Sequence, residues 1–513
     1  MNLLRAVATV SSMTFLSRVL GYVRDFFIAR TFDVGAETDA FFVAFRIPNL
    51  LRRMFAEGAF SQAFVPILSE YRNRQSPEET RSLVDAIGTI LFLALVVATV
   101  LGMLAAPLIG YLFAPGWYHQ KPEQYELTVQ LLRITFPYIL FISLVALAAG
   151  VLNTWSRFAV PAFTPVLLNV SFIIAAAFFA GRFDPPVAAL AWAVFIGGAL
   201  QLALQLPFLA RIGMLPRWRL DWRHPGLTRV RKLMLPALFG VSASQISLLI
   251  NSIFASFLVT GSVTWLYYAD RLMEFPAGVL GAALGTILLP SLSRHHASGA
   301  ADEYGRLLDW GLRITLLLAL PAAAALAVLA VPLITTLFHY GRFGAEDVWM
   351  TRQALVAYSL GLVGMILVKI LAPGFYARQN VMTPVKIGLV TLAATQVMNL
   401  AFIVPLKHAG LALAIGLGAC LNAALLYRNL RRQGIYTPQP GWGAFGARVA
   451  FAVAAMSVLL YFAMGPSTWW LQALWQHKVA AVCGLVVLGA GAYGLVLLAL
   501  GFHWRDFVRR EAP

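Results

Sequence analysis

Long apolar stretches separated by short polar ones recur along almost the whole chain, and this pattern predicts membrane-spanning helices. A helix that crosses a bilayer needs about 20 predominantly apolar residues. Fourteen stretches are of this kind, although the first two and the eighth also carry charges. They are residues 6–29, 38–60, 86–113, 127–151, 159–180, 186–208, 232–257, 263–289, 311–337, 352–373, 383–404, 409–427, 444–464 and 479–501. The sequence therefore predicts an all-α polytopic membrane protein with about 14 transmembrane helices.

The second of these stretches, residues 38–60, is the least ordinary because charged residues interrupt it. A helix turns by about 100° per residue, so positions seven apart nearly coincide. Asp39, Arg46 and Arg53 therefore share one stripe, and Glu57 lies one turn beyond Arg53. A charge at the bilayer centre costs roughly 2.5–3.5 kcal/mol. We expect the stripe to face a water-filled cavity or other helices, the alternative being a short amphipathic helix on the membrane surface.

Composition supports the membrane interpretation and excludes several other classes of protein. Hydrophobic residues make up 60% of the chain and charged residues only 12%, whereas soluble proteins carry about 25% charged residues. The net charge of +17 does not indicate nucleic-acid binding, because the basic residues are not gathered in one soluble patch. The two cysteines lie in apolar stretches, the histidines lie in loops or at span ends, and no nucleotide-binding loop is present. No disulfide framework, metal site, cofactor or direct use of ATP is expected.

The basic residues alternate between the two sides of the predicted membrane. If both termini lie on one side, that side carries 22 lysines and arginines outside the spans and the other side carries 7. Cytoplasmic loops carry the excess of basic residues in membrane proteins. We therefore expect both termini in the cytoplasm.

Short sequence matches six spans apart indicate an internal repeat. FVPILS at 64–69 resembles LLPSLS at 288–293, and Trp155 and Tyr376 each begin an aromatic-x-Arg group that a Thr-Pro-Val triplet follows. Weak internal similarity is typical of transporters built from two related lobes, and because six is even the lobes would be parallel. The predicted domains are an N-terminal lobe at 1–210, a C-terminal lobe at 211–432 and an appendage of two helices at 433–513.

Eleven of the charged side chains inside the predicted spans are candidates for function. They are Arg18, Arg24, Asp25, Arg46, Arg52, Arg53, Glu57, Asp270, Arg271, Glu274 and Lys369. Exposing all of them to lipid would cost on the order of 30 kcal/mol. Seven are cations and four are anions, and a hydrated site with surplus arginine suits an anion, phosphate in particular. The alternative is that Arg18–Asp25, Arg53–Glu57 and Arg271–Glu274 are ion pairs that serve packing alone.

Several long motifs closely resemble the MurJ (MviN) family of lipid II flippases, within the multidrug/oligosaccharidyl-lipid/polysaccharide exporter superfamily. The resemblance extends essentially from end to end. The motifs are SSMTFLSRVLGYVRD at 11–25, DAFFVAFRIPNLLRRMFAEGAFSQAFVPILSEY at 39–71, YYADRLMEFPAGVLGAALGTILLPSLS at 267–293, LAPGFYARQ at 371–379 and TPQPGW at 437–442. The resemblance implies two six-helix lobes around a central cationic cavity, with two C-terminal helices that border a hydrophobic groove.

The resemblance also implies a function and a set of site residues. The protein would be a transporter of the bacterial inner membrane, not an enzyme. It would move lipid II from the cytoplasmic to the periplasmic leaflet by alternating access, in contact with proteins of cell-wall synthesis. The family's essential arginines fall on Arg18, Arg24, Arg52, Arg53 and Arg271, and its other functional residues fall on Ser17, Asp25, Asp39 and Glu57. The charge pattern adds Asp270, Glu274 and Lys369 as supporting residues.

We expect Arg24, Arg52 and Arg271 to bind the diphosphate of lipid II, while Asp25, Glu57 and Asp270 hold these arginines in place. Some family members bind sodium through acidic residues on the helices equivalent to the seventh and eleventh spans. This chain has Asn251 and Asn399 in that neighbourhood, which disfavours sodium coupling by the same site. Coupling to the membrane potential or to another monovalent cation stays open.

Two other functions fit parts of the sequence. One is export of a different lipid-linked oligosaccharide; the surplus of arginine argues against cationic drugs as the cargo. The other is a membrane-embedded transferase acting on the same lipid. Such an enzyme needs a pair of carboxylates with metal-binding geometry on a cytoplasmic loop. The predicted loop 60–85 offers only Glu70, Glu78, Glu79 and Asp85 for that purpose.

Overall fold

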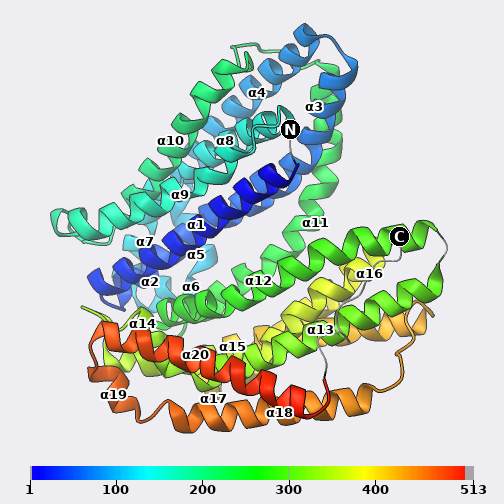
Figure 1. Ribbon diagram of the computed structural model, residues 1–513. Coiled ribbons are helices and arrows are strands. Elements are labelled where there is room, and N and C mark those ends of the chain that lie inside the picture. The colour runs from blue at the N-terminus through cyan, green and yellow to red at the C-terminus, as the bar shows by residue number, and fades with distance from the viewer. Residues whose placement is uncertain (1–2, 299, 503–513) are drawn as a thin grey trace. The chain divides into compact units, whose positions relative to one another are not determined.

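The computed structural model describes residues 3–298 and 300–502, and every regular element in these ranges is a helix (Figure 1). Helical side chains at 3–11, 55–58, 235–244, 248, 282–283, 285–287 and 301 lie outside that description. The chain divides by its internal contacts into two compact units, Met1–Thr264 and Trp265–Pro513. Each unit is described by itself below.

The N-terminal unit contains eleven α-helices and three short segments of other helix type. They are α1 (Leu3–Thr31), α2 (Ala36–Leu51), the π-helix η1 (Arg52–Phe60), α3 (Ser61–Arg74), α4 (Pro77–Leu104), α5 (Ala106–Phe113), α6 (Pro115–Gln120), α7 (Pro122–Thr135), α8 (Tyr138–Thr154), α9 (Ala159–Ile174), η2 (Ala175–Phe179), η3 (Ala180–Arg182), α10 (Ala188–Arg211) and α11 (Pro225–Ser256). Helix α9 packs against both α1 and α10, and α11 packs against η1 and α3.

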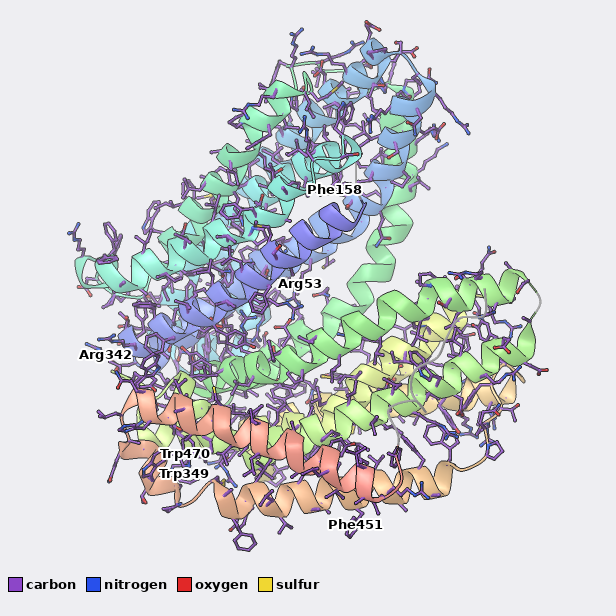
Figure 2. The ribbon with its side chains drawn as sticks, in the orientation of Figure 1. Arg53, Phe158, Arg342, Trp349, Phe451 and Trp470 are labelled. Atoms are coloured by element: carbon purple, nitrogen blue, oxygen red, sulfur yellow. The ribbon has the colours of Figure 1, made fainter. Side chains whose placement is uncertain are left out.

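The C-terminal unit begins inside α12 (Ser262–Ala297), whose first three residues belong to the N-terminal unit. Its other helices are α13 (Ala301–Val328), α14 (Ala330–Leu337), α15 (Ala345–Leu371), α16 (Pro373–Tyr376), α17 (Met382–Arg432), α18 (Trp442–Ala463), α19 (Ser467–Gln472) and α20 (Trp475–Ala499). Helix α15 packs along α17 and α13, and α18 packs against α20. Phe451 on α18 points away from the rest of this unit (Figure 2), as expected of a side chain that faces lipid.

Nine helical segments in the described part of the chain are long and apolar enough to cross a membrane. They account for ten predicted spans, because α17 contains two of them and bends at Lys407 (φ 50°, ψ −127°). The other four predicted spans fall on α1, α2 with η1, α11 and α12. Of these, α1, α2 with η1, and α12 carry the charged side chains that set them apart from ordinary spans. The polytopic helical fold is confirmed, and the exact count of 14 stays a prediction.

The lobe boundaries predicted from the repeat also stay a prediction. The contact division falls after Thr264 because α11 packs on η1 and α3, and it therefore groups the predicted seventh span with the first six. The predicted boundaries follow from sequence similarity between the two repeats, whereas the observed division follows from the density of contacts. The division therefore does not test the predicted boundaries.

Local sequence explains where several helices begin and change. Ser76 starts α4 with a capping box: its Oγ accepts from the N–H of Glu79 at 3.2 Å, and the Glu79 carboxylate accepts from the N–H of Ser76. Pro48 in α2 has no N–H for the carbonyl of Ala44, and the hydroxyl of Thr135 donates to that carbonyl at 3.4 Å. The helix then continues as the π-helix η1, a form found frequently at functional sites.

Glycines bring α15 and α17 into close contact in the C-terminal unit. A Cβ placed on Gly361 would lie 2.0 Å from the Cα of Gly416, and one on Gly364 would lie 2.5 Å from the backbone nitrogen of Cys420. Small residues of this kind let membrane helices approach at backbone distance.

Replacing Gly361 with alanine is therefore expected to destabilise the protein by about 1–3 kcal/mol, because the new methyl group forces two backbones apart. The measurement is the thermal unfolding midpoint of the purified protein in detergent. Gly388 on α17 is the control, because a Cβ there would meet nothing within 4 Å. Equal unfolding midpoints for Gly361→Ala and Gly388→Ala would contradict the close packing.

Candidate functional site

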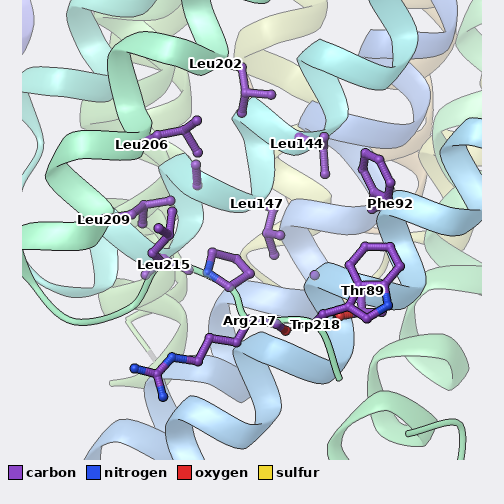
Figure 3. A pocket seen from close by; sticks show the side chains of 14 residues that line it. Thr89, Phe92, Leu144, Leu147, Leu202, Leu206, Leu209, Leu215, Arg217 and Trp218 are labelled. Atoms are coloured by element: carbon purple, nitrogen blue, oxygen red, sulfur yellow. Dashed lines mark hydrogen bonds between the residues drawn. The ribbon is translucent and has the colours of Figure 1, made fainter. Parts of the chain in front are cut away.

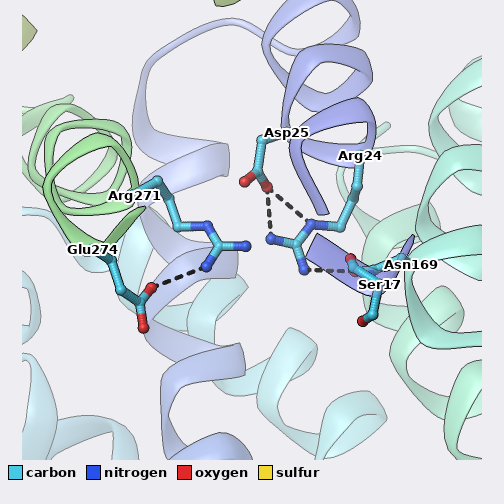
Figure 4. Close-up of polar contacts among 6 residues, drawn as sticks. All are labelled: Ser17, Arg24, Asp25, Asn169, Arg271 and Glu274. Carbon is cyan, nitrogen blue, oxygen red and sulfur yellow. Dashed lines mark hydrogen bonds and ion pairs between the residues drawn. The ribbon is translucent and has the colours of Figure 1, made fainter. Parts of the chain in front are cut away.

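Arg24 and Asp25 on α1 form a buried ion pair. The Nη2 and Nε of Arg24 donate to Asp25 Oδ1 at 2.7 and 2.9 Å, and the Asp25 side chain is wholly buried (Figure 4). The predicted alternative paired Asp25 with Arg18 because these residues lie seven positions apart. Among the contacts described, Asp25 is instead paired with Arg24, whose long side chain folds back to its neighbour, and Arg18 is exposed.

Helix α9 contributes further contacts to Arg24. The Nη1 of Arg24 donates to the side-chain oxygen of Asn169 at 3.2 Å, and Asn169 donates in turn to the backbone carbonyl of Ser17 at 3.0 Å (Figure 4). The guanidinium also lies 5.4 Å from the ring centroid of Phe172. Sequence reasoning missed Asn169, although an amide inside the apolar stretch 159–180 was the available signal.

Asp39 on α2 is buried and binds the first turn of α12. Its Oδ2 accepts from the N–H of Gly261 at 2.7 Å, and its Oδ1 accepts from the N–H and the hydroxyl of Thr264 at 2.8 and 2.6 Å. A carboxylate at this position satisfies N–H groups that have no partner within the helix and favours the positive end of the helix dipole. Asp39 is thus an N-terminal cap supplied from another helix.

The predicted stripe begins on α2 and meets a change of helix type at η1. Arg46 donates to the hydroxyl of Ser252 on α11 at 2.7 Å, so Asp39 and Arg46 both face other helices of the unit. Beyond Arg52 the chain is a π-helix, in which hydrogen bonds span five residues and a seven-residue step no longer returns to the same face. Arg53 is only the second residue of η1, so the prediction that it shares the stripe stays a prediction.

The remaining charged residues of η1 differ in exposure. Arg52 is half-buried, and its Nε donates to the side-chain oxygen of Asn49 at 3.0 Å. Arg53 is exposed (Figure 2). The side chain of Glu57 lies outside the described residues, so its predicted pairing with Arg53 stays a prediction.

The C-terminal unit carries its own group of charges on α12. The Nη1 of Arg271 donates to Glu274 Oε2 at 3.1 Å, one helical turn away, and both side chains are partly exposed (Figure 4). Asp270 is exposed on the same helix. Lys369 on α15 donates to the backbone carbonyl of Ala277 at 3.0 Å. Lys369 therefore contacts α12, a neighbour that the position of Lys369 in the sequence did not indicate.

Contacts near Asp39 hold the same end of the N-terminal unit together. The N–H of Gly116 donates to the hydroxyl of Ser256 at 3.0 Å, and the ammonium of Lys121 donates to the carbonyl of Leu258 at 3.0 Å. Burial lowers the pKa of Lys121, and the nearby Asp39 carboxylate opposes that shift. In the described part of the chain, no three histidine, cysteine or acidic side chains gather as metal ligands would. The arrangement offers cations held by fixed acceptors, which suits the binding of an anion.

Comparison with known sequences gives a consistent result. The model of the family described as "Lipid II flippase MurJ" matches residues 28–479. The chain is 51% identical to "Lipid II flippase MurJ" of Burkholderia cenocepacia, over 99% of this chain and 100% of that protein. It is 44% identical to "Probable lipid II flippase MurJ" of Vibrio cholerae, over 98% of this chain and 97% of that protein.

Comparison with solved structures agrees with the sequences. A structure described as "Lipid II flippase MurJ, inward closed conformation" has a TM-score of 0.80 and 25% identity, covering 98% of this chain and 99% of the other. An inward-facing multidrug resistance MATE family transporter of the MOP superfamily has a TM-score of 0.66 and 15% identity, covering 84% of this chain and 98% of the other. The second likeness is one of fold alone.

Proposed function

The chain belongs to the MurJ family of lipid II flippases, and from this premise we propose how its charged residues handle the substrate. The protein is a transporter, not an enzyme. It is an integral, multi-pass protein of the bacterial inner membrane that moves lipid II for peptidoglycan synthesis from the cytoplasmic to the periplasmic leaflet by alternating access. Our proposal adds that both termini lie in the cytoplasm, which the distribution of basic residues supports.

We propose that Arg24, Arg52 and Arg271 bind the diphosphate of lipid II. One observation carries this proposal: each of the three guanidiniums is oriented by an acceptor within its own unit. These acceptors are Asp25 and Asn169 for Arg24, Asn49 for Arg52, and Glu274 for Arg271. A guanidinium has five N–H donors in a rigid fork that matches phosphate oxygens, so an arginine that uses some of these donors for its acceptors can bind an anion with the others.

The acceptors also set the strength of binding. A carboxylate beside an arginine competes with the phosphate for the same charge, so the anion is bound less tightly than by an isolated arginine. A transporter needs this compromise, because a substrate that is bound too tightly on one side of the membrane is not released on the other. Arg18, Arg53, Asp270 and Lys369 then contribute charge around the headgroup. Contacts with other proteins of cell-wall synthesis stay a prediction.

Replacing Arg52 with alanine is expected to slow lipid II transport by roughly 10- to 100-fold, the loss that follows from removing one charge-assisted hydrogen bond of about 1.5–3 kcal/mol. Arg52→Lys keeps the positive charge but not the planar guanidinium. Its transport rate should lie between those of the wild type and of Arg52→Ala. The measurement is growth of cells depleted of their native flippase, together with lipid II exposed on the outer leaflet.

Two further variants make this test specific. Arg74 lies exposed at the end of α3, and Arg74→Ala should support normal growth at the same expression level. Asn49→Ala removes the acceptor that orients Arg52 and should reduce transport less than Arg52→Ala does. Normal growth with Arg52→Ala would show that Arg52 does not bind the diphosphate.

A further inference from the structure

An apolar cavity of about 210 Å³ lies inside the N-terminal unit (Figure 3). Helices α4, α8 and α10 form its walls, and the loop that joins α10 to α11 covers one side. Six of its fourteen lining residues are leucines: Leu144, Leu147, Leu202, Leu206, Leu209 and Leu215. None of the arginines assigned to the diphosphate takes part, so this cavity is separate from the proposed substrate contacts.

The loop over the cavity is fastened to α4 through its backbone. The N–H of Arg217 donates to Asp85 Oδ1 at 2.8 Å, and the N–H of Arg219 donates to the hydroxyl of Thr89 at 2.9 Å. Pro216 packs directly on Gly88, where a Cβ would come within 2.9 Å of the proline ring. Leu215, Pro216, Arg217 and Trp218 of this loop contribute to the lining of the cavity.

The arginines and tryptophans between positions 217 and 223 are exposed. Trp218 is 70% exposed and Trp222 is 61% exposed, while Arg217, Arg219 and Arg223 are exposed beside them. Figure 3 shows the guanidinium of Arg217 extending away from the leucines, and the ring of Trp218 lies 5.7 Å from that of Phe92. Tryptophan gathers at the membrane–water interface, and basic residues beside a membrane attract anionic lipid headgroups.

We propose that this cavity and its loop bind an anionic phospholipid of the bilayer. One acyl chain occupies the leucine-lined cavity, and the phosphate is bound by Arg217 and Arg223. Arg219 is assigned no part, because it already faces Asp221 at 3.8 Å. The apolar lining excludes a sugar or peptide as the occupant, and the basic rim selects an anionic headgroup over a zwitterionic one. The lipid thereby fixes the loop that connects α10 to α11.

The test uses the purified full chain and two synthetic lipids, phosphatidylglycerol and phosphatidylcholine with the same acyl chains. Native mass spectrometry counts the bound lipids and gives their affinities. The wild-type chain is expected to bind phosphatidylglycerol more tightly than phosphatidylcholine. The variant Arg217→Gln/Arg223→Gln should lose roughly 10- to 30-fold in phosphatidylglycerol affinity, at about tenfold for each 1.4 kcal/mol.

Controls separate the site from general charge effects and from the flippase proposal. Arg428→Gln removes an exposed arginine at the end of α17, away from the loop, and should leave the affinity unchanged. Leu206→Trp places a large ring against the cavity and should weaken binding of both lipids. Arg52→Ala should bind phosphatidylglycerol normally, so failure of the substrate assignment does not affect this test. The proposal is overturned if the double variant binds as Arg428→Gln does, or if lipid II competes phosphatidylglycerol out of the cavity.

Discussion

Replacing Arg24 with alanine is expected to abolish lipid II transport and to lower sharply the amount of folded protein. The wholly buried carboxylate of Asp25 would lose the guanidinium that now contacts it at 2.7 Å. Removing one member of a buried ion pair costs about 3–5 kcal/mol because the other charge remains buried without its partner. A loss of that size is a large part of the 5–15 kcal/mol that typically stabilises a folded protein.

A double variant separates the structural role of this pair from its proposed role in substrate binding. Arg24→Met/Asp25→Leu removes both charges and keeps apolar side chains of similar length. Replacing a buried ion pair with hydrophobic residues is often neutral or stabilising, so the double variant should recover the folded protein. It should not recover transport, because no guanidinium remains for the diphosphate.

Two measurements on each variant decide between these roles: folded protein by size-exclusion chromatography in detergent, and complementation of flippase-depleted cells. Arg30 lies exposed at the end of the same helix, and Arg30→Ala is the matched control for both. Full complementation by the double variant would remove Arg24 from the substrate contacts. Normal yield of Arg24→Ala would contradict the buried pair itself.

The spans were predictable because they depend on a local property, the length and apolarity of a stretch. The partners of the charges were not, because they come from far away in the chain. Asn169 lies 145 positions after Arg24, and Gly261 lies 222 positions after Asp39. Local periodicity says which side chains share a face, but it does not say which helix that face meets.

The change of helix type in the second predicted span shows a different limit. The step of seven residues assumes an α-helix, and it held for Asp39 and Arg46. At Arg52 the π-helix begins, four residues after Pro48. A proline in the sequence predicts that one helical hydrogen bond is missing. Whether the helix then bends, breaks or widens depends on the helices packed around it.

The apolar cavity under the α10–α11 loop had no signature in the sequence for a related reason. Its leucines come from α8, α10 and the loop that follows α10, and they are indistinguishable in the sequence from leucines that fill a core. Only the arginines and tryptophans between positions 217 and 223 were visible in the sequence, where the arginines indicated the orientation of the chain in the membrane. The cavity depends on how helices are spaced, which composition does not specify.

Replacing Asp39 with alanine is also expected to abolish transport, because Asp39 attaches the first turn of α12 to the N-terminal unit. The N–H groups of Gly261 and Thr264 would lose their buried acceptor. Each such loss costs about 1–3 kcal/mol, so the first turn of α12 would be loosened by roughly 2–6 kcal/mol. The next residue, Trp265, donates to Asp347 at 2.8 Å within the C-terminal unit. Adjacent residues of one helix are therefore fastened to different units.

Graded variants test whether this attachment, rather than the charge of Asp39, is what transport requires. Thr264→Val removes one hydroxyl and keeps both backbone contacts, so it should retain most transport. Asp39→Asn keeps one acceptor oxygen, so its transport rate should lie between those of Thr264→Val and Asp39→Ala. Glu123→Ala, which removes an exposed carboxylate from α7, is the control. Complementation ranks the variants by transport activity. Hydrogen exchange of the peptide that contains residues 258–268 measures the stability of the first turn of α12. Unchanged exchange in Asp39→Ala would refute the capping role, because the loss of two buried hydrogen bonds must speed the exchange of the N–H groups that made them.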